Sequence, residues 1–175
     1  MPEPIEITKI KENKNNREYV KNQVQQQGSL LEFASEQLRD DKEIVMEAVK
    51  NNPEAFEFAS NRLKEDREIA FESVSHAGWT YCYIEGNLLQ DKELLLAGLK
   101  VTGQILYYAD INMRDDEEIV LEAVKNKPII IKYASLRLRE NKEIGKVAME
   151  KDKSCYEFLG ENLKQDEEIL NIKNA

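Results

Sequence analysis

The sequence predicts an all-α solenoid of about six helix-turn-helix repeats, taken to wind as a right-handed superhelix because that hand is the commoner one. The first observation behind this prediction is a period of 25 residues without insertion or deletion, with repeats beginning at residues 16, 41, 66, 91, 116 and 141. The second is a helix start signal at the head of each repeat. The third is a pair of apolar arcs with helical spacing in each repeat. Two short helices cannot bury such arcs alone, whereas stacked repeats share a continuous core.

The first helix of each repeat is expected to start at position 1, which is always Asp or Asn, with Glu always at position 3. The Asp or Asn side chain accepts from amides of the first turn, and the Glu interacts favourably with the positive end of the helix dipole. Apolar or small residues at positions 4, 5, 8 and 9 give one face of a helix of about ten residues. Position 13 is expected to end it, because Gly or Pro stands there in five repeats: Gly28, Pro53, Gly78, Gly103 and Pro128.

The second helix is expected across positions 15 to 23, where apolar residues stand at 15, 16, 19 and 23, as in Ala55, Phe56, Ala59 and Leu63. An aromatic residue stands at position 18 of every repeat: Phe33, Phe58, Tyr83, Tyr108, Tyr133 and Phe158. At 100° per residue these positions fill one wide arc, so the helix must pack on two sides. We interpret the aromatic residues as core and not as a stacking platform for bases.

The two ends of the chain depart from the repeat. Residues 1–15 lie outside the period, and we expect an extended or disordered segment there. Residues 16–175 are expected to form a single solenoid domain, which a capping helix closes from Asp166 onward. The first repeat carries Lys21, Asn22 and Gln23 where later repeats are largely apolar or small, as befits an end that faces water.

Composition excludes several function classes. The chain has 175 residues, a net charge of −9 and 41% apolar residues, so it can bury a core but offers no strongly basic surface for nucleic acid. Neither a membrane span nor a signal peptide is present, which predicts a soluble, cytoplasmic protein. One histidine and two cysteines make no metal site of known spacing and no disulfide framework, and we expect no cofactor.

Polar residues at position 22 fall inside the apolar arc of the second helix. They are Gln37, Arg62, Asn87, Asn112, Arg137 and Asn162. We interpret them as a structural polar ladder that bonds loop carbonyls or the adjacent repeat, because buried polar groups need partners. The alternative is a row of donors that line a groove for an extended peptide. The Glu stripe at position 3 likewise has a helix-dipole role or serves as an acidic track for a Lys- or Arg-rich partner. Basic residues at position 24 are expected on a solvated face.

The pattern L-x-x-A-S-x-x-L-[RK]-x-D-[KR]-E-I-V-x-x-A-V is complete across Leu31 to Val49. Phe56 to Val74 fits it with departures at Ala70 and Ser73, and Ile131 to Ile144 fits its first half. This pattern resembles a bacterial repeat family, the domain of unknown function 4116. The resemblance implies tandem helical repeats and carries over no catalytic residue, cofactor or substrate.

The third repeat departs most from the pattern and carries the candidate site, since a site is built most easily where the repeat is broken. Its stretch SHAGWTYCYIEGN holds His76, Trp79, Tyr81 and Tyr83. With Arg62, Asn87 and Asn112 they are the candidate partner-binding residues; the competing interpretation is a repacked bend. A Cys82 nucleophile with a His76 base would be the catalytic version. It is disfavoured, because no oxyanion device is visible and position 17 is exposed elsewhere.

The favoured function is therefore a non-enzymatic protein-interaction scaffold that binds a peptide or partner protein along one face of the solenoid, near the third repeat. A basic partner would match the Glu stripe, and a monomer is favoured. Two alternatives stay open: a small-ligand or catalytic pocket centred on the third repeat, and a purely structural repeat block of a larger assembly.

Overall fold

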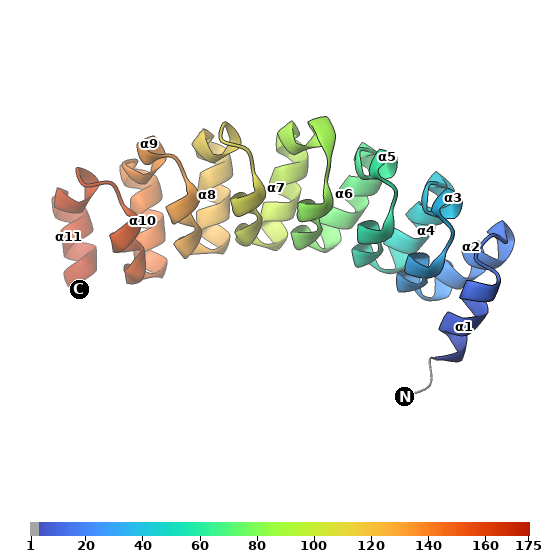
Figure 1. The fold of residues 1–175 in the computed structure, drawn as a ribbon. Coiled ribbons are helices and arrows are strands. Elements are labelled where there is room, and N and C mark those ends of the chain that lie inside the picture. The colour runs from blue at the N-terminus through green and yellow to red at the C-terminus, as the bar shows by residue number, and fades with distance from the viewer. Residues whose placement is uncertain (1–3) are drawn as a thin grey trace. The chain divides into compact units, whose positions relative to one another are not determined.

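A computed structural model of the chain describes residues 4–175, in which helices joined by short turns occur and no strand does. The predicted all-α repeat fold is confirmed (Figure 1). The chain divides into two compact units, an N-terminal unit up to Leu88 and a C-terminal unit from Leu89, and each is described by itself. A single domain over residues 16–175 stays a prediction.

The N-terminal unit holds repeats one to three. Its elements are α1 (Ile5–Glu12), α2 (Arg17–Gln26), η1 (Gly28–Phe33), α3 (Glu36–Arg39), α4 (Lys42–Asn51), η2 (Pro53–Phe58), α5 (Asn61–Lys64), α6 (Arg67–His76) and η3 (Gly78–Tyr83), where η denotes a 3₁₀-helix. A further 3₁₀-helix, η4 (Gly86–Gln90), spans the division between the units.

The C-terminal unit holds repeats four to six and the closing helix. Its elements are α7 (Lys92–Val101), η5 (Gly103–Tyr108), η6 (Met113–Asp115), α8 (Glu117–Asn126), η7 (Pro128–Tyr133), α9 (Leu136–Arg139), α10 (Lys142–Lys151), η8 (Lys153–Phe158), η9 (Leu163–Gln165) and α11 (Glu167–Asn174).

The first helix of each repeat forms as the sequence predicts. Each of these helices is ten residues long, and the carboxylate of Asp41, for example, accepts from the amides of Glu43 and Ile44 at the start of α4. Asp66 caps α6 and Asn141 caps α10 in the same manner. The side chain therefore satisfies amides that the helix itself leaves without partners.

The segment after each long helix differs from the expected single helix. In repeat two it is the six-residue 3₁₀-helix η2, then extended backbone at Ala59 and Ser60, then the four-residue helix α5. Ser60 Oγ accepts from the Leu63 amide and thereby starts the short helix as its N-cap. The extended pair interrupts the helix. A helical wheel at 100° per residue therefore does not predict which side chains of this segment face the core.

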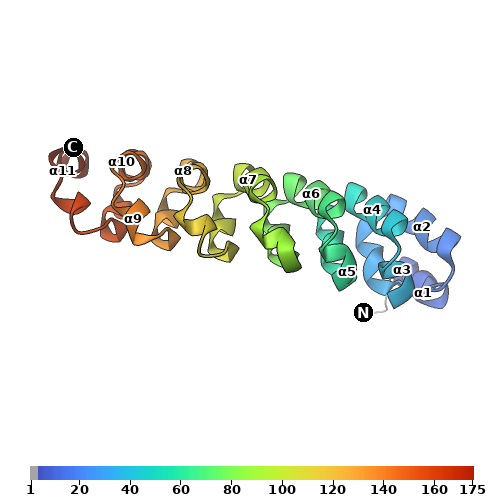
Figure 2. The same ribbon diagram turned by 90° about the horizontal axis from the view of Figure 1, so that it is seen from above.

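The core of each unit lies between the row of long helices and the row of 3₁₀-helices. In the N-terminal unit α4 packs on η1 before it and η2 after it, and in the C-terminal unit α8 packs on η5 and η7. Figure 2 shows the two rows within each unit, with α3, α5 and α9 on the 3₁₀ side. Positions 4, 5, 8 and 9 of α4, α6, α7, α8 and α10 are buried, whereas in α2 Tyr19 and Gln23 at positions 4 and 8 are half-buried. Positions 15 and 16 are buried in every repeat except at Tyr156, which is half-buried.

Hydrogen bonds between successive repeats hold the stack in register. The Ser60 amide donates to the Arg39 carbonyl over 2.9 Å, and the Ser135 amide donates to the Arg114 carbonyl over 3.0 Å. On the other edge the Gly28 amide donates to Asn51 Oδ1 over 2.7 Å, and the Gly103 amide donates to Asn126 Oδ1 over 2.9 Å. Repeats in both units are thus fixed by the same bonds.

Glycine at position 13 has a further role besides ending the long helix. A Cβ at Gly28 would lie 2.2 Å from the Ala48 carbonyl oxygen of the next repeat, and a Cβ at Gly103 would lie 2.5 Å from that of Ala123. Both distances are far below van der Waals contact. At these two positions glycine is needed because the backbone of the next repeat approaches closely.

The N-terminal end of the chain differs from the prediction, and the C-terminal end agrees with it. The extended or disordered N-terminal segment expected over residues 1–15 is wrong for its middle part, because residues 5–12 form α1 and Ile10 is fully buried. This helix packs on η1 and covers the first repeat. Residues 1–3 lie outside the described part of the chain. Asp166 caps the predicted closing helix α11 through the amides of Glu168 and Ile169.

Candidate functional site

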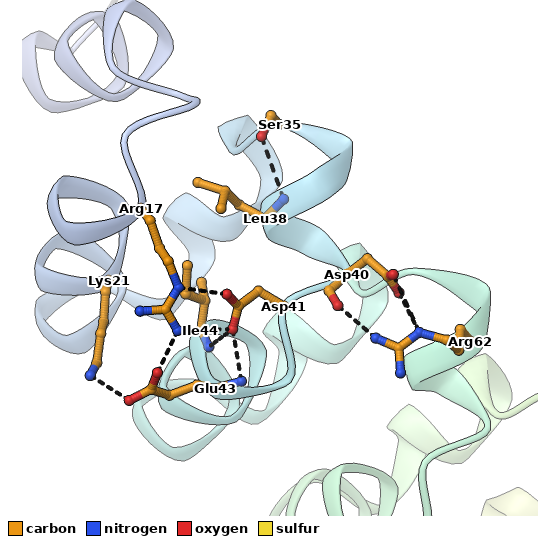
Figure 3. Close-up of polar contacts among 9 residues, drawn as sticks. All are labelled: Arg17, Lys21, Ser35, Leu38, Asp40, Asp41, Glu43, Ile44 and Arg62. Carbon is orange, nitrogen blue, oxygen red and sulfur yellow. Dashed lines mark hydrogen bonds and ion pairs between the residues drawn. The ribbon is translucent and has the colours of Figure 1, made fainter.

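The Glu stripe at position 3 belongs to an ion-pair ladder between repeats. In repeats one, two, four and six the basic residue at position 2 pairs with the position 1 Asp and the position 3 Glu of the next; repeat five instead has Glu117, which accepts from Asn141. Lys92, for example, lies 2.8 Å from Asp116 and 2.9 Å from Glu118. Figure 3 shows the first rung, in which Arg17 and Lys21 bind Asp41 and Glu43. The Arg17 hydrogen bond holds the pKa of the Asp41 carboxyl below its usual value.

This ladder changes the interpretation of the stripe. Each pair is exposed and contributes little stability by itself, since solvent screens it. The pairs do neutralise much of the negative charge of the stripe, and they align one long helix with the next. Most carboxylates of the stripe are therefore paired within the chain, which disfavours the stripe as an acidic track for a basic partner.

The position 22 residues form a second ladder in part. Arg62 donates to the Asp40 carbonyl and carboxylate, Arg137 donates to those of Asp115, and Asn162 donates to the Glu140 carboxylate. These three side chains bond to the repeat before them, which is the bonding that the ladder interpretation expects. They are not buried, because Arg62 and Arg137 keep 63% and 60% of their side-chain area exposed. Gln37, Asn87 and Asn112 are also exposed.

The third-repeat candidates do not form one site. Tyr81 is wholly buried and takes the core place that Phe56 has in repeat two. Trp79 is 40% exposed and meets Tyr83 edge to face, with ring centroids 5.6 Å apart. His76 lies exposed at the end of α6, where its Nδ1 is 2.9 Å from the Glu72 carbonyl.

The cysteines are free thiols without signs of activation. Cys82 is half-buried and Cys155 is buried. Burial raises the pKa of both thiols, that of Cys155 to about 11. A nucleophilic cysteine needs the opposite shift. Within residues 4–175, His, Cys, Asp and Glu side chains make no group of three or more placed to hold a metal ion.

The aromatic residues at position 18 are not core, contrary to the prediction. They lie half-buried along the 3₁₀ side of each unit, and Tyr108 is 50% exposed. The physical reason is the interrupted second segment, which leaves position 18 at the end of the 3₁₀-helix while position 16 enters the core. The basic residues at position 24 are less exposed than predicted, because Arg39, Arg114 and Arg139 are half-buried and not on a solvated face. Position 18 of one repeat and position 24 of the repeat before it thus line a surface.

Position 17 of one repeat lies against the aromatic residue at position 18 of the next. In the N-terminal unit Glu57 and Tyr83 meet in this way. Burial first, and then the hydrogen bond to Glu57, raise the pKa of the Tyr83 phenol to about 12. In the C-terminal unit the pair is Tyr107 and Tyr133, with ring centroids 5.1 Å apart and planes at 67°. Tyr108 adds a third ring 5.1 Å from that of Tyr107.

These rings belong to an apolar surface on repeats four and five, which we call the tyrosine face. Its members are Tyr107, Tyr108, Ile111, Tyr133 and Leu136. Tyr107 is 53% exposed, Ile111 75% and Leu136 57%. Exposed apolar side chains scattered singly are normal on a protein surface, whereas a contiguous group marks an interaction site.

Two hollows lie on the tyrosine face, and Tyr133 lines both. The first, of about 280 Å³, lies between Tyr107, Tyr108 and the loop and helix of η7. The second, of about 360 Å³, lies between Ile111 and Leu136. Small-molecule sites usually measure ~300–1,000 Å³ and enclose most of their ligand. Two small neighbouring hollows suit successive side chains of a peptide better than one compact ligand.

The linings of these hollows are basic. Lys127 and Lys132 line the first hollow and Arg114 lines the second, and neither lining includes Asp or Glu. Lys132 lies over the rings of Tyr133 and Phe158, 4.9 and 5.9 Å from their centroids. Arg114 Nε is buried and has no hydrogen-bond partner within residues 4–175. A positive rim on an apolar surface therefore occurs in a chain whose net charge is −9.

The sequence reasoning missed the tyrosine face, although the signal was present. Position 21 is Glu36 in repeat one and Asn61 in repeat two but Ile111 and Leu136 in repeats four and five. Position 17, which is Glu in three repeats, is Tyr107 in repeat four. Large apolar residues at two positions that are polar in repeats one, two and six identify this surface once the repeats are aligned.

Comparison with known families agrees with the repeat. The family model described as Domain of unknown function (DUF4116) matches residues 16–64, 41–89, 66–114, 91–139 and 116–164. The matches advance by 25 residues and start where the repeats were placed from the sequence. The chain belongs to this family, as the resemblance predicted.

A search of curated proteins and a search of solved structures each give no significant match. Across residues 4–175, no helix has the length and apolar character that a membrane crossing requires. The fold and the surface of the chain itself therefore provide the basis for a functional proposal.

Proposed function

We propose that this chain is a non-enzymatic protein-interaction module, which binds a peptide segment of a partner protein on the tyrosine face. The observation that carries the proposal is the contiguous exposure of Tyr107, Tyr108, Ile111 and Leu136 beside two hollows. Tyrosine suits this role because it offers a large, rigid contact area and a hydroxyl for hydrogen bonding.

The surface is not explained by the needs of the fold. At the corresponding junction in the N-terminal unit the same backbone carries Glu36, Phe58 and Asn61, and the core beneath it is equally buried. The apolar residues Tyr107 at position 17 and Ile111 and Leu136 at position 21 are thus not required for stacking. Exposing them to water has no benefit to the fold, which supports a partner as the reason for them.

The proposed site lies on repeats four and five and not on the third repeat. The protein is proposed to be a cytoplasmic monomer. A pocket on the third repeat and a purely structural repeat block are the rival hypotheses.

The test is selection of a random phage-displayed peptide library on the purified chain, followed by fluorescence anisotropy with each selected peptide. The double variant Tyr107→Ser, Leu136→Asn removes the apolar contacts, and Asn is the residue that repeat two carries at this position. We expect at least about tenfold weaker binding, the usual effect of losing one anchor side chain.

The matched control is Trp79→Ser, which removes an exposed aromatic side chain from the other unit and should leave binding unchanged. Loss of binding in this control would transfer the site to the third repeat. Failure to enrich any peptide, or full binding by the double variant, would refute the tyrosine face. Light scattering of the wild type and the double variant tests self-association. If the wild type is a dimer and the double variant is a monomer, the ligand of the tyrosine face is a second copy of this chain and not a peptide.

A further inference from the structure

We infer that the partner segment is acidic and apolar: carboxylate side chains placed beside aromatic or aliphatic ones. This inference rests on the proposed function and specifies its ligand. It is carried by the three cations that line the hollows, Lys127, Lys132 and Arg114.

Within residues 4–175 these cations have no internal carboxylate, unlike the basic residues of the two ladders. Lys92 and Lys142 each contact two acids of the next repeat, and Arg137 contacts Asp115. In contrast, Lys127 donates to the neutral amide of Gln104, and Lys132 lies over two aromatic rings and forms no ion pair in the part of the chain that the structure describes. Arg114 forms no ion pair there. The charges at the tyrosine face are thus available to a ligand.

The two lysines are specific to repeat five, whereas Arg114 belongs to repeat four and has a counterpart, Arg39, in repeat one. Where Lys127 stands, repeat two has Asn52, and where Lys132 stands, repeats one, two and six have Glu32, Glu57 and Glu157. Lysine over an aromatic ring keeps its ammonium group at the rim of the hollow, because the ring holds the cation while water still reaches it.

The local charge outweighs the net charge for a bound ligand. At physiological salt, exposed charges more than about 8 Å apart are largely screened. A segment on the tyrosine face therefore interacts with the three rim cations and much less with the overall charge of −9. Acidic side chains gain there, whereas lysine or arginine side chains would meet like charges.

Single-stranded nucleic acid is the competing anionic ligand, since it also uses aromatic rings and cations. Three cations in a chain of net charge −9 fall short of the strongly basic track that phosphate binding needs. The observations favour the peptide, and an oligonucleotide serves as a direct comparison in the test.

The experiment uses the peptide pool selected from the random library and the full chain. We expect Asp and Glu to be enriched beside aromatic and aliphatic residues, and we expect affinity to fall as salt is added. The variant Lys132→Glu, which copies Glu57 and Glu157, should weaken the tightest selected peptide by about tenfold. Lys127→Asn, which copies Asn52, should weaken it by about threefold. A twin peptide with Lys in place of each acid should bind the wild type poorly and regain affinity for Lys132→Glu.

The outcomes separate this inference from the proposed function. If the selected peptides carry no excess of acid, and Lys132→Glu has no effect while the Tyr107→Ser, Leu136→Asn variant loses binding, the module stands and the acidic ligand is refuted. Enrichment of Lys and Arg refutes it as well. An oligo-deoxythymidine that binds more tightly than the selected peptides would replace the peptide with nucleic acid. If the library gives no binder at all, the proposed function itself fails.

Discussion

Two junctions between repeats, one in each unit, have the same construction and opposite surfaces. In the N-terminal unit the hollow between repeats one and two is lined by Glu36, Arg39, Phe58, Ala59, Ser60 and Asn61. In the C-terminal unit the hollow between repeats four and five is lined by Ile111, Arg114, Tyr133, Ala134, Ser135 and Leu136. Each residue of the first set stands at the repeat position of its counterpart in the second.

The constant and variable members of these linings differ in what they contact. The arginine, the alanine, the serine and an aromatic ring recur, and the serine amide bonds the arginine carbonyl in both junctions. The residue at position 21 is not part of this hydrogen bond, and it is Glu or Asn in the first junction and Ile or Leu in the second. Stacking therefore fixes one set of positions and leaves another free to acquire a ligand, which is where function on a repeat scaffold is to be sought.

The largest expected effect tests whether the cores beneath the two junctions are equivalent. Leu63 of α5 and Leu138 of α9 occupy the same repeat position, and both are fully buried. Replacing either with Ala should lower the free energy of unfolding by about 2–5 kcal/mol, because the substitution removes buried methyl groups and leaves a cavity. Urea unfolding followed by circular dichroism measures the loss. A loss in one variant several times that in the other would break the equivalence of the two cores.

The next effect concerns the close approach between repeats. Gly28→Ala and Gly103→Ala would each push a methyl group against a carbonyl oxygen of the next repeat. We expect both to destabilise by about 1–3 kcal/mol, the usual range for overpacking. The same urea titration applies. Stabilisation by some tenths of a kcal/mol, as a less flexible unfolded chain would give, would mean that the contact relaxes freely.

The sequence predicted the features that repeat at every step. The Asp or Asn cap, the ten-residue helix and the closing helix after Asp166 follow from local chemistry that each repeat states again. It mispredicted the second segment because apolar spacing alone does not reveal an extended Ala-Ser pair. Ser35, Ser60 and Ser135 were the available signal, since serine is a preferred N-cap and each one starts a short helix.

The site that we propose lies outside the third repeat, where the sequence predicted it, for a related reason. Rare residues drew attention to the third repeat, but Tyr81 there proves to be core because it occupies position 16. The tyrosine face is made of ordinary residues at positions whose exposure depends on where the 3₁₀-helix ends. Only the structure shows that positions 17, 18 and 21 share a surface.

A transplant of the tyrosine face tests whether surface residues alone account for the difference between the junctions. The substitutions are Glu32→Tyr, Glu36→Ile, Glu57→Lys and Asn61→Leu, which copy Tyr107, Ile111, Lys132 and Leu136. We expect stability to change by no more than about 0.5 kcal/mol, since exposed positions tolerate substitution. Calorimetric titration with a selected peptide should show a second site. A single site in the transplanted chain would mean that binding also needs the local backbone or Lys127, which the transplant does not copy.

The smallest effect should be the same in both units, because it belongs to the scaffold. Ser60 first, and then Arg62, hold the pKa of the Asp40 carboxyl below its usual 3.8, and Ser135 and Arg137 do so for Asp115. A carboxyl with a lowered folded-state pKa stabilises the fold above the unfolded-state pKa. It loses that contribution as the pH falls through the folded-state value.

Asp40→Asn and Asp115→Asn keep the shape of the side chain and remove its charge. Each should shift the urea midpoint slightly downward at neutral pH. The difference from the wild type should shrink as the pH falls below about 4, where the natural carboxyl is protonated first in the unfolded state and then, at lower pH, in the folded state. Urea titrations at neutral and acidic pH measure both differences. A shift that stays constant with pH would assign the effect to hydrogen-bond geometry alone, and a shift in only one unit would show that the second ladder is not common to the two junctions.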